Sequence, residues 1–218
     1  MHEYKVIDIN TWARKNTFDF FRSFQCPCFD VTFPLNVEKL YKYAKEKKYS
    51  FFALMLYALH ESLDAVPEFR QRLVKIPAKD GGEDVFEAWE FARNDMMTPI
   101  LLDDNSFCQV LLEAKDSFAE YRQQAEERFA YAREHKVFHF ENRRDVYNAS
   151  CMPWFKFTSL KTAFRADYLD LPLLSWDKMD ENYNINLAVH VNHTFVDGFH
   201  IGLLVKELEK RLALPESL

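Results

Sequence analysis

Apolar side chains recur at helical spacing in five segments of the chain. These segments, predicted as helices, are residues 11–24, 37–47, 51–63, a long stretch that follows Ser117 and the stretch that begins at Gly198. Residues 51–63 are apolar on nearly all sides, so this helix is expected to be buried. Ser117 and Glu120 have the Ser-x-x-Glu spacing of a capping box, which marks the start of the fourth helix.

Short apolar runs bounded by turn-forming residues predict the strands. They are residues 29–33, 70–76, 85–91, 96–101, 108–113, 146–157, 171–176 and 183–191. Helices and strands do not alternate regularly along the chain, which favours an α+β fold. We expect residues 1–218 to form a single two-layer domain, in which helices pack on a mixed, mostly antiparallel sheet.

The composition supplies a large core and limits the partners. Hydrophobic residues make up 48% of the chain and aromatic residues 16%, which suits thick sheet packing or a large apolar pocket. A formal net charge of -6 offers no basic surplus for binding nucleic acid or anionic membrane surfaces. The first residues lack the pattern of a signal peptide, and the apolar run 51–59 is too short to span a bilayer, so we expect a cytoplasmic protein.

The positions of the cysteines and the scarcity of glycines argue against metal and nucleotide sites. Cys26-Pro27-Cys28 has the ligands for half of a metal site, but no second Cys or His pair stands at a matching interval. We therefore expect the four cysteines to be buried free thiols and the chain to bind no metal. The chain has only four glycines and neither a GxGxxG nor a P-loop pattern, which disfavours dinucleotide and nucleoside triphosphate chemistry.

The stretch HVNHTFVDGFH, residues 190–200, carries three of the seven histidines at the end of a predicted strand. One hypothesis is a metal site, although the three histidines are not spaced for one helix face. A second is purely structural, with Asp197 capping the following helix, Gly198 relieving the turn and the histidines satisfying backbone groups. The third is that His193 is a general base, because a neutral imidazole can take a proton from an alcohol or thiol near neutral pH.

The wider pattern resembles a known family. His193 to Gly198 fits the HxxxDG signature of coenzyme A-dependent acyltransferases, and the continuation DGFH resembles the chloramphenicol acetyltransferase family in particular. Further segments that resemble this family, in the same order, are Trp12-Ala13-Arg14-Lys15, Pro67-Glu68-Phe69-Arg70, Asn148-Ala149-Ser150-Cys151-Met152-Pro153-Trp154, and Pro172 with Ser175 and Lys178. The resemblance covers nearly the whole chain and implies a coenzyme A-dependent acyltransferase-like fold.

The resemblance implies direct transfer of acetyl from acetyl-CoA, a co-substrate rather than a permanently bound cofactor, to a hydroxyl of chloramphenicol. His193 matches the general base, whose other ring nitrogen is held by its own backbone carbonyl in the family. Ser150 matches the donor to the tetrahedral oxyanion. Asp197 matches an aspartate that pairs with an arginine, here Arg14, and supports the turn that carries the base. The family is a homotrimer whose active sites lie between subunits.

The resemblance also assigns substrate contacts. The residues expected in the acceptor pocket are Phe20, Phe21, Phe29, Phe107, Phe138 and Ser175, with ordinary core packing as the alternative for each phenylalanine. Those expected at coenzyme A are Lys178 and Trp154, with a solvated surface lysine as the alternative for Lys178. Three positions depart from the family, because Asn192 replaces a histidine, Ser175 replaces a threonine and Ser50 replaces a lysine found near coenzyme A in some members. Two alternatives therefore stay open: another hydrophobic alcohol as acceptor, and a catalytically silent relative that binds an acyl-CoA or a partner.

Overall fold

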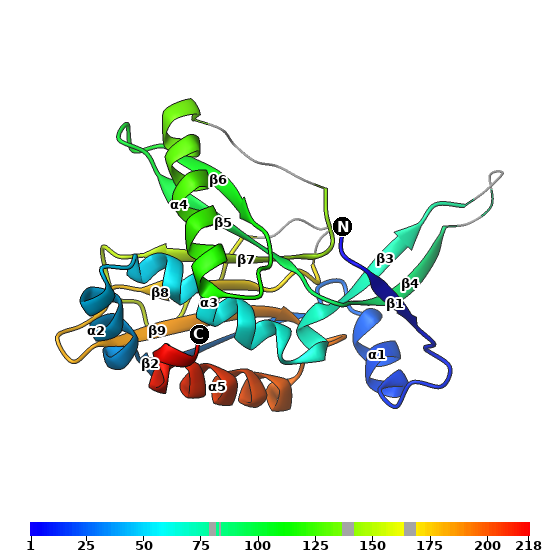
Figure 1. The fold of residues 1–218 in the computed structure, drawn as a ribbon. Helices are drawn as coiled ribbons and strands as arrows, with labels where there is room; N and C mark the ends of the chain where they lie inside the picture. Colours follow the sequence, from blue (N-terminus) through cyan, green and yellow to red (C-terminus); the bar gives the residue numbers. More distant parts are fainter. Residues whose placement is uncertain (79–81, 83, 137–141, 164–168) are drawn as a thin grey trace.

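A six-stranded mixed sheet lies at the centre of the fold in the computed structural model, which describes residues 1–78, 82, 84–136, 142–163 and 169–218 (Figure 1). Its strands, in spatial order, are β2 (Cys28–Asn36), β9 (Asn184–Asn192), β8 (Leu173–Asp177), β7 (Val146–Met152), β5 (Asp95–Leu101) and β6 (Phe107–Leu112). The β8–β7 and β7–β5 pairs are parallel, and the other neighbours are antiparallel. The predicted α+β class with a mixed, mostly antiparallel sheet is confirmed.

One face of this sheet forms the core together with helices. The helices are α1 (Lys15–Arg22), α2 (Glu38–Lys47), α3 (Phe51–Asp64), α4 (Phe118–His135) and α5 (Gly198–Ala213), and Pro67–Arg70 and Pro215–Ser217 are short 3-10 helices. Ile185, Leu187 and Val189 of β9 are buried in one apolar cluster with side chains of α3 and α5. Successive side chains of a strand point to opposite faces, so Ser150 and Ser175, which pair across β7 and β8, lie on the other face.

A second sheet extends beside α1 (Figure 1). Within the described residues it has three strands, in the order β1 (Tyr4–Ile7), β4 (Val85–Phe91) and β3 (Gln71–Ile76). We did not predict β1. Three of its four residues are exposed, so its sequence shows no alternation between a buried and an exposed face.

Two elements, α1 and β7, are several residues shorter than predicted. α1 begins at Lys15 rather than at residue 11, because a turn comes first, in which Thr11 N donates to Asp8 O at 3.2 Å. The strand predicted for residues 146–157 ends at Met152, because Pro153 has no N–H for the ladder and lies in a turn.

The predicted starts of α4 and α5 are confirmed. Ser117 Oγ accepts from Glu120 N at 3.3 Å at the start of α4, although the Glu120 carboxylate bonds the Ser117 hydroxyl rather than the backbone. α5 begins at Gly198. No helix in the described ranges combines the length and the apolar content needed to cross a membrane.

Candidate functional site

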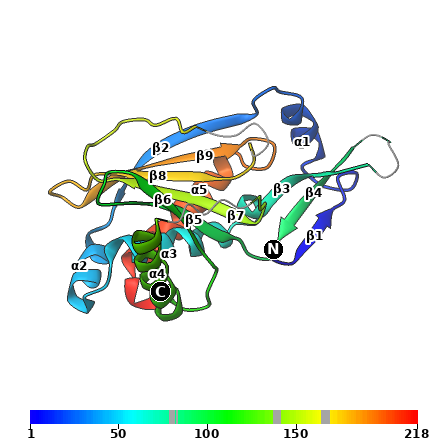
Figure 2. The same cartoon turned by 90° about the horizontal axis from the view of Figure 1, so that it is seen from above.

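His193 follows directly after β9, and contacts from α1 and β2 fix its position. Its N–H donates to Pro27 O at 2.6 Å, just before the start of β2. Its ring stacks on Phe21 with centroids 3.8 Å apart and planes at 10°, and the Phe29 ring lies 4.7 Å away. Figure 2 shows α1 at the end of the sheet where β9 finishes, with α2 at the opposite end. The imidazole is thus held between a strand end and two aromatic rings.

Asn192, which stands where the family has a histidine, shapes the turn after β9. The residue is buried, and its Oδ1 accepts from Thr194 N at 2.8 Å. Its carbonyl accepts from Phe195 N at 3.2 Å and Val196 N at 3.0 Å. Asn192 therefore stabilises, through its side chain and its carbonyl, the turn that carries His193.

One ring nitrogen of His193 is buried. Nδ1 has no hydrogen-bond partner in the part of the chain that the structure describes, so the bond expected to the histidine's own carbonyl is not formed. Nε2 is left as the nitrogen that a substrate can reach. A neutral imidazole accepts a proton at Nε2 only when Nδ1 carries one. Stacking on Phe21, rather than a hydrogen bond, holds this ring.

Asp197 links the turn after His193 to α1. Arg14 Nη1 donates to Asp197 Oδ2 at 2.8 Å, which is the ion pair that the resemblance implies. The other carboxylate oxygen accepts from Phe199 N at 3.0 Å and caps α5. Burial raises the pKa of Asp197, but the hydrogen bond from Arg14 and the charge of Arg14 oppose it, and this pKa lies below its usual range.

We expect Asp197→Asn to lower the free energy of unfolding by about 1.5–3 kcal/mol, the usual worth of a hydrogen bond to a charged group. Asparagine caps helices as well as aspartate does, so the change isolates the ion pair with Arg14. A carboxyl with a lowered pKa stabilises the fold above its unfolded pKa, so the difference should be present at neutral pH and shrink in acid. Denaturant unfolding of both proteins measures it, with Arg14→Ala completing the cycle. Equal midpoints at pH 7 would show that the pair contributes nothing.

The other two histidines of residues 190–200 have structural partners. His190 Nδ1 lies 2.8 Å from Asp30 Oδ1 on the neighbouring strand. His200 Nδ1 accepts from Asp197 N at 3.0 Å and completes a capping box, and burial lowers the pKa of His200, which favours the neutral ring that this bond needs. The structural hypothesis thus explains His190, His200 and Asp197. It does not explain Gly198. The backbone there is not left-handed, and an added Cβ would meet no atom within 4 Å, so the turn does not require a glycine.

Ser150 faces a large, mostly apolar cavity. Its Oγ lies 2.8 Å from Ser175 Oγ across β7 and β8. Both line a cavity of about 950 Å³, together with Phe107, Trp154 and other side chains. A hydroxyl at an apolar wall is suited to donate a hydrogen bond to a bound substrate.

The structure does not bring His193 and Ser150 together within one chain. Ser150 pairs with Ser175, and Ser175 pairs with Ala188 of β9. His193 lies five positions after Ala188, from 188 to 193. At about 3.3 Å per residue and about 4.8 Å between strands, the Cα atoms of the two residues are roughly 20 Å apart. At this separation the two groups of one chain cannot act together on the same reacting carbon.

The residues expected in the acceptor pocket also fall into two groups, one at His193 and one at Ser150. Phe21 and Phe29 contact His193, and Phe20 packs on Phe21 with ring centroids 5.0 Å apart. Phe107, in contrast, lines the cavity beside Ser150, as Ser175 does. Phe138 lies outside the described residues.

Of the two residues expected to contact coenzyme A, Trp154 lines the cavity and is 62% exposed. Lys178 lies beside the lining residue Asp177, and its N–H donates to the carbonyl of Phe155, the residue after Trp154, at 3.1 Å. We did not predict two charged residues of the lining, Arg133 at the end of α4 and Asp177 at the end of β8. The basic last turn of α4 is the only signal in the sequence that points to Arg133.

The observed burial of three of the four cysteines differs from the prediction. All four are free thiols, but only Cys108 is buried. Cys28 and Cys151 are half-buried, and Cys26 is exposed. The expectation of four buried thiols is wrong because Cys26 lies in the loop between α1 and β2 rather than within the strand.

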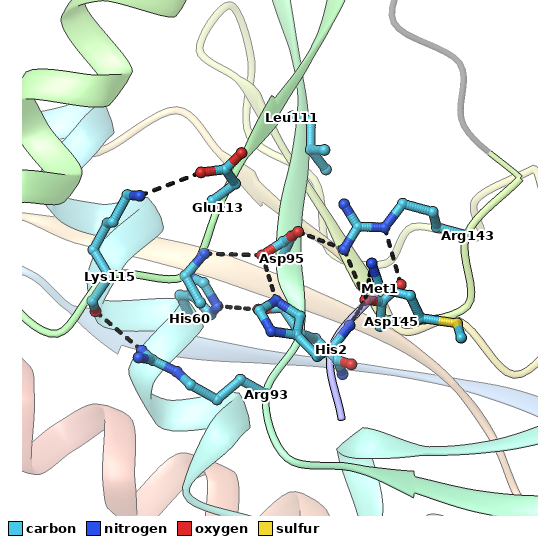
Figure 3. Close-up of polar contacts among 12 residues, drawn as sticks. Met1, His2, His60, Arg93, Asp95, Leu111, Glu113, Lys115, Arg143 and Asp145 are labelled. Carbon is cyan, nitrogen blue, oxygen red and sulfur yellow. Dashed lines mark hydrogen bonds and ion pairs between the residues drawn. The ribbon is translucent and has the colours of Figure 1, made fainter. Parts of the chain in front are cut away.

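A second group of charged residues gathers around β5 and the residues before β1 (Figure 3). Asp95 and Asp145 are buried, and Arg143 lies within 2.6 Å of the first and 2.7 Å of the second. His2 Nε2 lies 2.7 Å from Asp95. Burial raises the pKa of Asp95, but the hydrogen bond from His2 and its other partners lower it to about 2. Carboxylates that are ionised and paired in this way are typical of a structural network.

Known proteins match nearly the whole chain. Residues 2–209 match the family model described as chloramphenicol acetyltransferase. A chloramphenicol acetyltransferase from a Klebsiella species is 25% identical over 212 residues, which cover 95% of this chain and 93% of that protein. A solved chloramphenicol acetyltransferase superposes with a TM-score of 0.81 at 27% identity, covering 96% of this chain and 100% of that chain. The probable dihydrolipoamide acetyltransferase of Listeria monocytogenes shares the fold, with a TM-score of 0.61 at 14% identity over 98% of this chain and 94% of that one.

Proposed function

Because the chain belongs to the chloramphenicol acetyltransferase family, we propose that it transfers the acetyl group of acetyl-CoA directly to a hydroxyl of chloramphenicol. The observation that carries the proposal is the placement of His193 after β9, with Nδ1 buried and the ring stacked on Phe21. Acetylation of the antibiotic would give resistance. The cytoplasm, where acetyl-CoA is available, is the proposed place of action.

In the proposed reaction, Nε2 of His193 takes the proton of the acceptor hydroxyl while the oxygen attacks the thioester carbonyl. The tetrahedral oxyanion accepts a hydrogen bond from the Ser150 hydroxyl. The C–S bond then breaks, and the leaving thiolate of coenzyme A takes the proton from His193. No acyl-enzyme forms, so the two substrates must be bound together.

Ser175 completes this arrangement by setting the direction of the Ser150 hydroxyl. The two Oγ atoms are 2.8 Å apart, and either of them can be the donor. If Ser175 donates, the proton of Ser150 is free to point at the oxyanion. The serine that replaces the family's threonine at position 175 can thus still orient Ser150.

The distance between His193 and Ser150 supports a site shared between subunits. We propose a homotrimer in which His193, Phe21 and Phe29 of one subunit face the Ser150 cavity of the next. Residues 1–218 would act as one domain, since one apolar cluster runs from Phe18 to Leu212.

The proposed donor site is the part of the Ser150 cavity that Trp154 and Arg133 line. Trp154 offers an exposed ring on which an adenine can stack. Lys178 is exposed and Arg133 lines the cavity, so each can approach a phosphate group of coenzyme A. Arg133 would supply a cation that Ser50, also in the lining, does not.

Loss of the thioester of acetyl-CoA, followed by absorbance with and without chloramphenicol, tests the proposed function. We expect loss that depends on chloramphenicol and a product heavier by one acetyl group. Loss with other hydrophobic alcohols but not with chloramphenicol would change the acceptor and keep the chemistry. No loss with any acceptor, from protein that binds acetyl-CoA, would identify a silent relative.

We expect Ser150→Ala to lower turnover about 10² to 10³-fold, the usual worth of one oxyanion donor. The Michaelis constants should change little, because the oxyanion exists only in the transition state. Steady-state kinetics with both substrates measure the effect. A change confined to the Michaelis constants would mean that Ser150 contacts only the ground state.

A further inference from the structure

Two thiols flank the carbonyl that holds the backbone of His193. Cys26 is exposed in the loop after α1, and Cys28 is half-buried at the start of β2. Between them Pro27 is buried, and its carbonyl accepts from His193 N at 2.6 Å. Cys28 Sγ donates to Leu169 O at 3.3 Å. A change at these thiols therefore acts on the segment that positions the imidazole.

We propose that Cys26 and Cys28 form a redox-sensitive dithiol site that reacts with low-molecular-weight disulfides and closes to a Cys26–Cys28 disulfide. The thiolate of Cys26 attacks the small disulfide, forms a mixed disulfide and releases one small thiol. Cys28 then loses its proton, attacks Sγ of Cys26 and releases the second small thiol. The protein is oxidised by two electrons, and the small disulfide is reduced to two thiols.

Exposure and position assign the order of these steps. Cys26 is the exposed thiol and so meets the reagent first. Burial, and next the charge and hydrogen bond of Cys26, raise the pKa of Cys28 to about 12. Both contributions of Cys26 disappear once its sulfur is in a mixed disulfide, so Cys28 becomes easier to ionise for the second step. Only Pro27 separates the two cysteines along the chain, so the second step joins residues that are already neighbours.

The closed disulfide would be strained and easily reduced. An extended chain places Cα atoms two positions apart at about 6.6–7.2 Å, whereas disulfides usually join Cα atoms about 4.4–6.8 Å apart. Closure therefore tightens the backbone at Pro27, whose φ is fixed by its ring. Strained and exposed disulfides have more oxidising potentials and are the labile ones. Reversible closure is thus expected, rather than a permanent structural bridge.

Tightening at Pro27 acts on His193 through two contacts. It moves the carbonyl that bonds His193 N, and it shifts Phe29, which follows Cys28 directly and packs on the imidazole. The oxidised protein should therefore lose the alignment of the ring. The effect on turnover rests on the proposed function of His193, but formation of the disulfide does not.

Oxidised glutathione is the probe. After treatment of the reduced protein at pH 8, we expect the loss of two titratable thiols and an intact mass lower by two hydrogens, mapped to the peptide that contains residues 26–28. Turnover should fall at least tenfold and return with dithiothreitol. Cys26→Ser should keep its basal turnover and resist the treatment. Cys28→Ser should stop at a glutathione adduct on Cys26, because the second thiol is missing.

Mass and activity separate the outcomes. Two unchanged thiols, or a wild-type protein that keeps the adduct on Cys26, would overturn the dithiol site. A disulfide at residues 26–28 with unchanged turnover would overturn its coupling to His193. If the protein transfers no acetyl group at all, the thiol count and the mass still decide whether the disulfide forms.

Discussion

Turnover should fall at least a thousandfold when His193 is replaced by alanine, with both substrates still bound. A positioned general base contributes about 10² to 10⁴ in rate, and we place His193 near the upper end because the ring is fixed by Phe21, Phe29 and the backbone bond to Pro27. Alanine removes the base but leaves the turn made by Asn192, so the fold should persist. Single-turnover kinetics with acetyl-CoA and chloramphenicol measure the chemical step.

The control for His193→Ala is Phe199→Ala, which removes a ring that is 72% exposed near the same turn. We expect it to stay within about twofold of wild type, because this exposed ring does not line the Ser150 cavity and substitutions of exposed side chains usually have small effects. Equilibrium binding of both substrates to His193→Ala separates lost chemistry from lost affinity. Turnover within tenfold of wild type would contradict the role of His193 as general base. A loss of activity explained entirely by weaker substrate binding would contradict it as well.

The sequence predicted the central sheet well because most of its strands have a buried face. β5 begins one residue before its predicted range, and β9 is displaced by only one residue at each end. β1 was missed because its pattern is set by pairing with β4 rather than by burial. The ends of α1 and β7 were misplaced because a turn at Asp8 and the missing N–H of Pro153 act locally, inside segments that are otherwise apolar.

The candidate site was predicted by motif, and its geometry was not. The spacing of His193 and Asp197 and the match of Arg14 identified an ion pair that the structure forms. No pattern in the sequence shows that Nδ1 of His193 has no hydrogen-bond partner among the described residues, because this depends on backbone torsions in one turn. Arg133 reaches the cavity because α4 packs on β6 and α3, and Asp177 reaches it because β8 lies between β7 and β9. Motifs name the groups that react, whereas the groups around them follow from tertiary packing.

Mixed trimers of His193→Ala and Ser150→Ala chains should regain about a third of wild-type activity, although each variant alone is nearly inactive. In a closed ring of three, every interface joins His193 of one subunit to Ser150 of the next. Either mixed composition, two chains of one variant and one of the other, contains one interface in which both residues are intact. Another interface then lacks both, and the last lacks one. The gain follows from the distance of roughly 20 Å between the two residues within a chain.

Two different affinity tags, one on each variant, isolate the mixed trimers after co-expression. Trimers mixed after separate folding should stay inactive unless subunits exchange, and this is the matched control. A chain that carries both substitutions, co-expressed with wild type, gives a second check. A ring with one such chain keeps one intact interface of three, and a ring with two keeps none, because each double-variant chain spoils both of its interfaces. Mixed trimers no more active than either parent would refute the shared site, and light scattering that reports a monomer would remove its premise.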